Sequence, residues 1–189
     1  MKGIVEIIGD IVEESREGLL IELFDIEEAV FKEEHQPHLS YIFGNSRYVK
    51  EQLDLYSKSV PSSDTKFPLV ALFTPVQEDR GVSSGYSSKV SLNIVIACST
   101  TKEWSNEERL EYSFIRVLRP IYRRILEALQ DSGYFDIEYD GRIPHRYSEN
   151  YSYGRYGAFT EDGQEVSEPI DAIVIRSMEL KIKNDYCRP

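Results

Sequence analysis

The segment "KFPLVALFTPV", residues 66–76, is the feature that most constrains how this chain can fold. Side chains of an extended backbone alternate between the two faces of the strand. Each face of this segment would carry an apolar set, namely Pro68, Val70 and Leu72 on one side and Leu69, Ala71 and Phe73 on the other. A strand that is apolar on both faces needs cover on both, so we expect it to lie inside a sheet with other layers packed against it.

Further strands are indicated later in the chain. "VSLNIVIACS", residues 90–99, follows a loop rich in Gly and Ser, which suggests an antiparallel pair with residues 66–76. "YFDIEYD", residues 134–140, reads as a third core strand, and residues 170–183 as a last one. In that last strand we expect one face to be shared by Ala172, Val174, Met178, Leu180 and Ile182, with Arg176 interrupting it.

The first sixty residues mix helix and strand patterns. Residues 4–16 have apolar positions at steps of three and four, which predicts an amphipathic helix. The apolar stretch 18–31 fits neither period cleanly and is open to a strand or a short helix. A short strand before the turn Gly44-Asn45 and a helix from about Ser46 complete this region.

A long helix is predicted between residues 105 and 133. Ser105 and Glu108 form a capping box at its start, and Gly133 is placed to end it. Its inward positions are Leu110, Phe114, Val117, Leu118, Ile121, Ile125 and Leu129. Pro120 lacks a backbone donor and crowds the carbonyl of Arg116, so a kink or a break is expected there.

Together these elements predict an α+β fold: an antiparallel sheet of about four strands, with the long helix and N-terminal helices packed on it and a long Tyr-rich loop or arm. We expect one domain over residues 1–189, with an N-terminal extension at 1–37 and the Tyr/Gly-rich loop or interface arm at 141–169. The shared core of sheet and helix should contain Val70, Leu72, Phe73, Val95 and Leu118.

Composition narrows the possible partners. Asp and Glu number 33 against 22 for Lys and Arg, and the net charge of −11 opposes tight binding to a phosphate backbone. Cys98 and Cys187 form neither a disulfide framework nor a metal-ligand spacing, which favours a reducing compartment. No apolar run is long enough to span a bilayer, so no membrane association is expected.

Two patterns in the sequence have catalytic or metal-binding readings. Residues 81–85 match the G-x-S-x-G pattern with Ser83 as nucleophile, but a strand follows instead of the helix that the motif requires, which favours a plain loop. The possible metal ligands Glu33, Glu34, His35 and His38 are interrupted by Pro37, which favours a solvated loop. We therefore expect no enzyme activity, no metal and no cofactor.

Candidate interface residues gather in two places. On the long helix, Arg116, Arg119 and Arg123 could face a partner, although acids before bases along a helix also suit its dipole. In the 141–169 segment the candidates are Arg146, Tyr147, Tyr151, Tyr153, Arg155 and Tyr156. Tyr and Arg are enriched at protein interfaces, and they also suit stacking on single-stranded nucleic acid.

With these residues placed, the chain resembles the tail completion and tail terminator proteins of tailed phages and prophages. The likeness rests on the order of four segments: "YIFGNSRYVKEQL", "KFPLVALF", "YSFIRVLRPIYRRILEAL" and "DAIVIRSMELKI". It spans residues 38–135 and 170–183, and it leaves out the segment 141–169 and the first residues of the chain.

The resemblance implies a small α+β subunit without catalytic residues that forms a ring at the head-facing end of a phage tail. The expected partners are further copies of the chain and neighbouring tail or head–tail connector proteins. The expected locations are the bacterial cytoplasm during assembly and then the virion tail. The alternative functions are a serine hydrolase using Ser83 and a single-strand binder using the Tyr/Arg arm.

Overall fold

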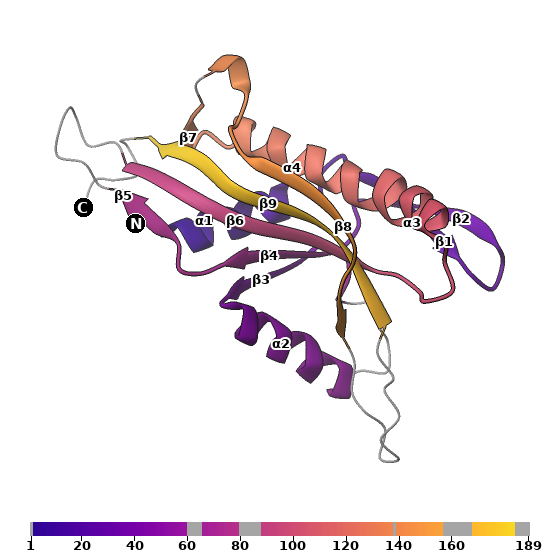
Figure 1. Cartoon of the computed structure of the whole chain (residues 1–189). Coiled ribbons are helices and arrows are strands. Elements are labelled where there is room, and N and C mark those ends of the chain that lie inside the picture. The colour runs from indigo at the N-terminus through magenta and orange to yellow at the C-terminus, as the bar shows by residue number, and fades with distance from the viewer. Residues whose placement is uncertain (1, 60–65, 80–87, 138, 157–167, 184–189) are drawn as a thin grey trace.

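The computed structural model describes residues 2–59, 66–79, 88–137, 139–156 and 168–183 (Figure 1). Its helical elements are α1 (Ile4–Glu14), α2 (Ser46–Ser59), α3 (Asn106–Arg109), the π-helical η2 (Leu110–Leu118), α4 (Arg119–Asp131) and the 3₁₀ turn η3 (Tyr139–Gly141). Its strands are β1 (Leu20–Asp25), β2 (Val30–His35), β3 (Ser40–Gly44), β4 (Leu69–Phe73), β5 (Gln77–Asp79), β6 (Ser88–Ser99), β7 (Phe135–Asp136), β8 (Arg146–Tyr156) and β9 (Glu168–Ile182).

The long antiparallel pair β6–β9 forms the centre of a seven-stranded sheet. On the free side of β6 lie β4 and β5, one after the other, and β3 pairs with β4. On the free side of β9 lie β8 and β7. The prediction of α+β elements around a sheet is confirmed, but the prediction of an antiparallel sheet of about four strands is wrong, because β3 and β4 are parallel and because β5 and β8 were not predicted as strands.

The opening strand β4 is covered on both faces, as its sequence predicted. We call the sheet face toward α1 and the long helix the inner face, and the face toward α2 the outer face; the long helix and α2 lie on opposite sides of the sheet (Figure 1). Val70 and Leu72 belong to the inner core, and Leu69 and Ala71 to the outer one. The two-sided apolar pattern thus corresponds to two separate packed layers.

The inner core joins α1, the long helix and the sheet. All seven predicted inward positions of the helix contact it, and six of them, from Phe114 to Leu129, are buried. The helix α1 contributes Ile7, Ile8, Ile11 and Val12, so the N-terminal residues predicted as an extension pack within the main core.

Two residues predicted for this core lie elsewhere. Val95 is buried in the outer core, and Phe73 packs against that same core while only partly buried. Both point away from Leu118 because side chains on successive positions of β4 and β6 alternate between faces.

The long helix is not broken at Pro120. The residues before it form the π-helical segment Leu110–Leu118, and Arg119 N–H donates to the carbonyl of Phe114, five residues earlier. Pro120 then occupies the first turn of α4, where a missing donor costs little. The π-helical turn that precedes Pro120 is wider than an α-helical turn and leaves room for the proline ring. The helix therefore continues through Pro120 and changes from π-helical to α-helical geometry there.

A one-residue bulge divides β9 into two parts. Leu92 pairs with Met178 and Ile94 with Ile175, so Asn93 stands opposite both Arg176 and Ser177. Ser177 has a φ of 51°, and its N–H donates to Asn93 Oδ1 at 3.2 Å. The extra residue places Ile175 and Met178 on the same face, so the predicted face is wrong: Ala172 and Val174 are in the outer core, whereas Met178, Leu180 and Ile182 are in the inner core.

Candidate functional site

The strand β8 is the main departure from the predicted loop. Its first half pairs with β9 from Arg146 opposite Arg176 to Asn150 opposite Ala172, and its second half pairs again from Gly154 to Tyr156. The segment 141–169 therefore contains an edge strand, and residues 157–167 of it lie outside the described residues. Tyr147, Tyr151 and Tyr153 are separated by even numbers of positions, and this period-two spacing is the signal that would have indicated a strand.

The tyrosines of β8 divide between the helix and solvent. Tyr147 packs on Tyr122 of α4 with ring centres 4.9 Å apart, and Tyr151 packs on Phe114 at 4.5 Å. Tyr153 is 45% exposed and lies in the irregular part of the strand. Tyr147 and Tyr151 thus contribute to packing while keeping exposed surface, and Tyr153 is the most exposed of these three tyrosines.

Glu149 fastens β8 to the long helix. Its carboxylate accepts two hydrogen bonds from the Arg119 guanidinium, at 2.7 and 3.0 Å, and one from the Tyr147 hydroxyl. The hydrogen bond from Arg119 lowers the pKa of Glu149, and the same pair raises the pKa of Arg119. Burial, followed by the neighbouring Glu149 carboxylate, raises the pKa of Tyr147. Arg119, predicted as an interface residue, is therefore engaged within the subunit.

A buried polar cluster holds the bulged middle of β8. The register of β8 shifts between Asn150 and Gly154, and Ser152 there has a φ of 53°. Ser152 N–H donates to Asp171 Oδ1 at 2.8 Å, and the Arg109 guanidinium reaches both the Ser152 hydroxyl and Asp171 Oδ1, the latter at 3.4 Å. Asp171 is 0% exposed and Arg109 7%. This ion pair links the start of the long helix, β9 and β8.

Cys98 lies beside this cluster as a buried thiol. Burial, reinforced by the nearby Asp171 carboxylate, raises the pKa of Cys98 to about 12. A thiol with so high a pKa stays protonated near neutral pH and is a poor nucleophile. The cluster is therefore suited to holding structure and not to covalent chemistry at this sulfur.

The remaining predicted interface residues have different surroundings. Arg116 stacks over the Phe31 ring at 3.8 Å and forms ion pairs with Glu22 at 2.5 Å and Glu111 at 2.6 Å. Since Glu22 lies on β1 and Phe31 on β2, Arg116 connects these two paired strands to the long helix. Arg123 and Arg146 are exposed. The backbone of Arg155 and Tyr156 belongs to the second half of β8.

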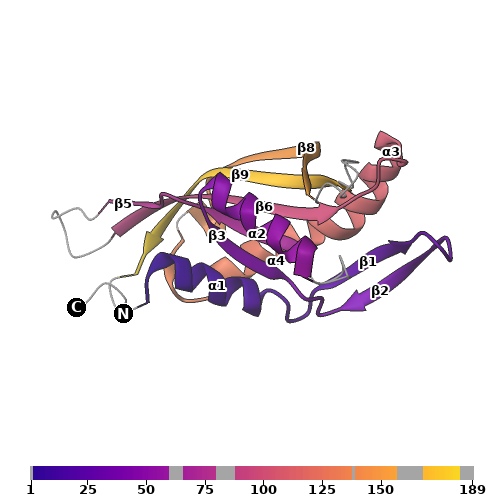
Figure 2. The same ribbon diagram turned by 90° about the horizontal axis from the view of Figure 1, so that it is seen from below.

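The hairpin β1–β2 is a second candidate that the sequence left open between strand and helix. One face packs on the long helix through an aromatic cluster of Phe24, Phe31, Trp104 and Tyr112. The tip extends past the neighbouring elements, as Figure 2 shows, and Leu23, Ile26 and Val30 are 39%, 62% and 45% exposed. Neither "LIELFD" nor "VFKEEH" alternates cleanly between apolar and polar residues, so the sequence carries only a weak signal for this hairpin.

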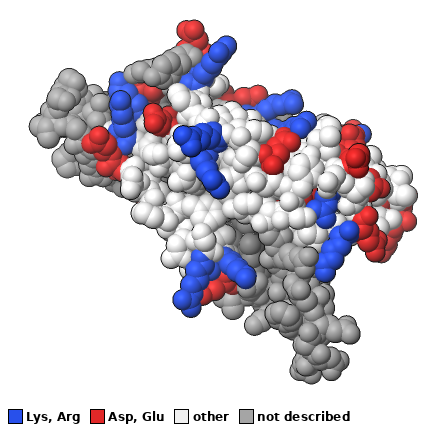
Figure 3. Space-filling view, in the orientation of Figure 1, with Lys and Arg blue, Asp and Glu red and all other residues white. Residues whose placement is uncertain are grey.

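The outer face becomes polar and charged away from α2, and two pairs of basic residues stand opposite each other there. Arg146 stands opposite Arg176, and Lys89 opposite Lys181, on neighbouring strands. Figure 3 shows Lys and Arg side chains gathered near the middle of this view, with neutral surface around them. Lys181 pairs with Asp136 at 3.2 Å. The apolar cover provided by α2 therefore ends before this half of the sheet.

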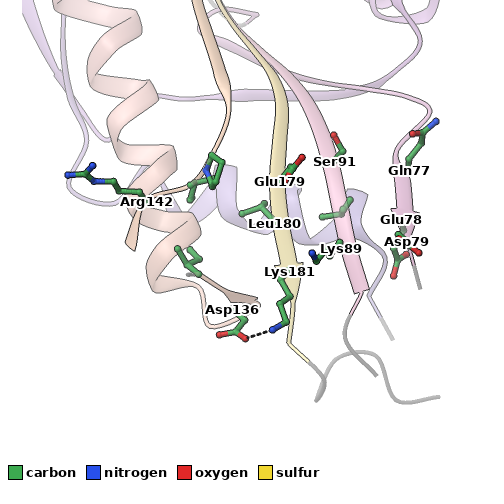
Figure 4. Close-up of a pocket in the computed structure, with 14 residues that line it drawn as sticks. Gln77, Glu78, Asp79, Lys89, Ser91, Asp136, Arg142, Glu179, Leu180 and Lys181 are labelled. Carbon is green, nitrogen blue, oxygen red and sulfur yellow. Dashed lines mark ion pairs between the residues drawn. The ribbon is translucent and has the colours of Figure 1, made fainter. Parts of the chain in front are cut away.

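A pocket of about 610 Å³ lies at the same end of the sheet (Figure 4). Apolar lining comes from Val90, Leu180, Ile143 and Pro144. Its charged lining mixes both signs, with Glu78, Asp79, Asp136 and Glu179 beside Lys89, Arg142 and Lys181. Figure 4 shows the Asp136–Lys181 pair across it and the Arg142 side chain directed away from that pair.

The residues considered for catalysis and for metal binding lie in different parts of the sequence. Ser83, the candidate nucleophile, lies outside the described residues. His145, the histidine that follows Ser83 in the sequence, forms a hydrogen bond with the Tyr122 hydroxyl at 2.7 Å. His35 lies 3.7 Å from Glu33 on β2, and both are exposed. Among the described residues no group of three or more acidic, His or Cys side chains is arranged to hold a metal ion.

No family model matches the chain, and no similar sequence is found among curated proteins. Within the described residues, no helix has the length and apolar character needed to cross a membrane.

Proposed function

We propose that this chain is a structural virion assembly protein that ends or joins a phage-like tail tube through ring-forming self-association. The observation that carries the proposal is the hairpin β1–β2, which extends from the body and exposes Leu23, Ile26 and Val30 (Figure 2). Neighbouring exposed apolar side chains mark interaction sites. A projecting contact element on a packed body is what a ring subunit requires.

The segments that resemble tail completion and terminator proteins support the same proposal. They correspond to β3 with the start of α2, to β4, to the long helix and to β9. These elements make up most of the two cores. In the proposed role the body is the shared subunit fold, while β1–β2 and β8 supply contacts to further copies and to neighbouring tail or connector proteins. No cofactor or catalytic step is involved.

The test is assembly of the full chain, alone and with its tube. Sedimentation velocity and negative-stain microscopy should show closed rings, and incubation with tubes of the tail tube protein from the same genome should cap one tube end. Leu23→Ser with Ile26→Ser should weaken ring formation, whereas Phe43→Ser, a control that is 50% exposed on β3, should not. A chain that stays monomeric at its highest soluble concentration and leaves tube ends bare would refute the proposal.

A further inference from the structure

The cross-strand pair Arg146 and Arg176 is unfavourable within the isolated subunit. The two residues are register partners on β8 and β9, and both are exposed. Like charges directly opposite each other destabilise a sheet, because the side chains lie within about 5.5 Å at Cβ. Arg119, in contrast, meets Glu149 in a bidentate pair on the other face of β8. The stability of the subunit therefore does not explain why two arginines stand opposite each other on the outer face.

A second basic pair extends the same face. Lys89 and Lys181 are register partners on β6 and β9, and Asp136 neutralises part of that charge through its contact with Lys181. We call Arg146, Arg176, Lys89 and Lys181 the basic face. On a chain whose net charge is −11, this face brings four basic side chains together across strands; Asp79, Asp136 and Glu179 lie beside the two lysines, and the described strand residues next to the Arg146–Arg176 pair on this face are not acidic. Such a patch attracts an acidic surface.

An acidic surface of that kind exists on the chain itself. Residues 20–35 contain six acids, which are Glu22, Asp25, Glu27, Glu28, Glu33 and Glu34. Lys32 contacts Asp25 at 2.6 Å and Glu28 at 3.1 Å, and Arg116 contacts Glu22. The hairpin tip stays acidic despite these pairs, and its Glu27 is exposed next to Ile26.

We propose that the basic face of one copy binds the hairpin tip, residues 25–30, of a second copy. Arg146 and Arg176 would meet Glu27 and Glu28, and the exposed Ile26 would be covered in the same contact. The two surfaces belong to different elements, so the contact is heterologous. Repeated head to tail, a heterologous contact closes a ring when the rotation between neighbouring copies divides a full turn, and this closure is part of the proposal. This inference rests on the proposed function, since it names the contact by which the ring forms.

A nucleic acid is the less favoured occupant. Glu179 and Asp136 lie on the same outer face beside Lys181, and Asp79 stands opposite Lys89. Acidic side chains among the basic ones weaken binding to a phosphate backbone, because each carboxylate repels the phosphates. The hairpin, which carries Lys32 among its acids, matches a face of mixed charge better.

Charge reversal and mixing test the contact. Sedimentation should show that Arg146→Glu with Arg176→Glu, and separately Glu27→Lys with Glu28→Lys, weakens self-association at least about tenfold. Mixing the two double variants should restore it, because one interface then pairs the original charges and the other pairs the reversed ones. Lys50→Glu with Lys102→Glu, which changes charge equally at exposed positions elsewhere, should have little effect.

Each alternative result has a defined meaning. Circular dichroism melting checks that the variants fold, and Arg146→Gln with Arg176→Gln is the milder substitute if charge reversal prevents folding. Wild-type rings that the basic-face variants leave unchanged would overturn this inference and keep the proposed function. A monomeric wild type would overturn both. DNA retention by the wild type that is lost in Arg146→Glu with Arg176→Glu would assign the face to nucleic acid and overturn the inference.

Discussion

The two faces of the seven-stranded sheet differ in how far their apolar cover extends. The inner face is apolar from β4 to the far end of β9, where Ile182 still belongs to the core under α1 and the long helix. The outer face is apolar only near α2, where Val49 packs on Ala71 and Val95, and becomes charged beyond Val174. Burial that stabilises the fold is therefore concentrated on the inner face, whereas apolar burial on the outer face is limited to the part near α2.

The largest effect should come from the buried ion pair on the inner side. Asp171→Ala leaves Arg109 buried without its carboxylate and frees Ser152, so we expect stability to fall by about 3 to 5 kcal/mol. Urea denaturation measures this change. Replacing both partners, as Arg109→Met with Asp171→Leu, should recover part of the loss. A fall below about 1 kcal/mol would show that the pair behaves like a surface salt bridge.

Matched truncations on the two faces should differ in size. Leu118→Ala removes a side chain that is 0% exposed in the inner core, and we expect a loss of about 2 to 5 kcal/mol. Val95→Ala, at 5% exposure in the outer core, deletes fewer buried carbons and should cost about 1 to 2 kcal/mol. Thermal melting monitored by circular dichroism compares them. An equal or larger loss at Val95 would reverse the proposed ranking of the faces.

The Arg119–Glu149 pair should make β8 docking depend on pH. The pKa of Glu149 is lower in the folded chain than in the unfolded one, so its contribution is present above the unfolded value, about 4.3, and is lost as pH falls through the folded pKa. Melting between pH 7 and pH 3 should therefore show a steeper acid decline for wild type than for Glu149→Gln. Parallel declines would mean that this carboxylate does not contribute.

The smallest effect concerns the basic face. Arg176→Ser removes the repulsion from Arg146, and we expect stability to stay constant or rise by about 0.2 to 1 kcal/mol. The same change should weaken self-association measured by sedimentation. A variant with unchanged or higher stability but weaker self-association would show that Arg176 serves assembly and not folding. A marked loss of stability would instead place Arg176 among the residues that hold the sheet.

Helices and strands were predicted best where the spacing of apolar residues in the sequence matches the side chains that the fold buries. The helix at residues 4–16, the helix from Ser46, the inward positions of the long helix and the two-sided strand at 66–76 all follow from apolar spacing. The helix at residues 4–16, the long helix and the strand at 66–76 each bury several apolar side chains, so their patterns show in the sequence. The hairpin β1–β2 and the strand β8 were less clear from the sequence, because they lie at edges and keep polar or exposed residues on one side.

The errors came from pairings between residues distant in sequence. Nothing local in "LSYIF" shows that β3 runs parallel to β4, and the π-helical turns before Pro120 depend on packing against β1 and β9. The Tyr-rich segment was predicted as a loop or arm, but Tyr147, Glu149 and Tyr151 find partners on a helix some thirty residues earlier. Arg119 and Arg116 likewise meet partners that only the folded chain reveals.

The bulge at Ser177 has a consequence for insertions and deletions in β9. If Ser177 took part in regular pairing, Met178, Leu180 and Ile182 would turn to the outer face and Glu179 and Lys181 would enter the inner core. Deleting Ser177 should therefore be tolerated, because Asn93 would then pair with Arg176 alone and Met178 would stay on the inner face. Deleting a residue on either side of the bulge should not be tolerated, because both sides are paired with β6. Asn or Gly could replace Ser177 at its positive φ, since the position needs a residue that accepts this backbone conformation and not a particular side chain.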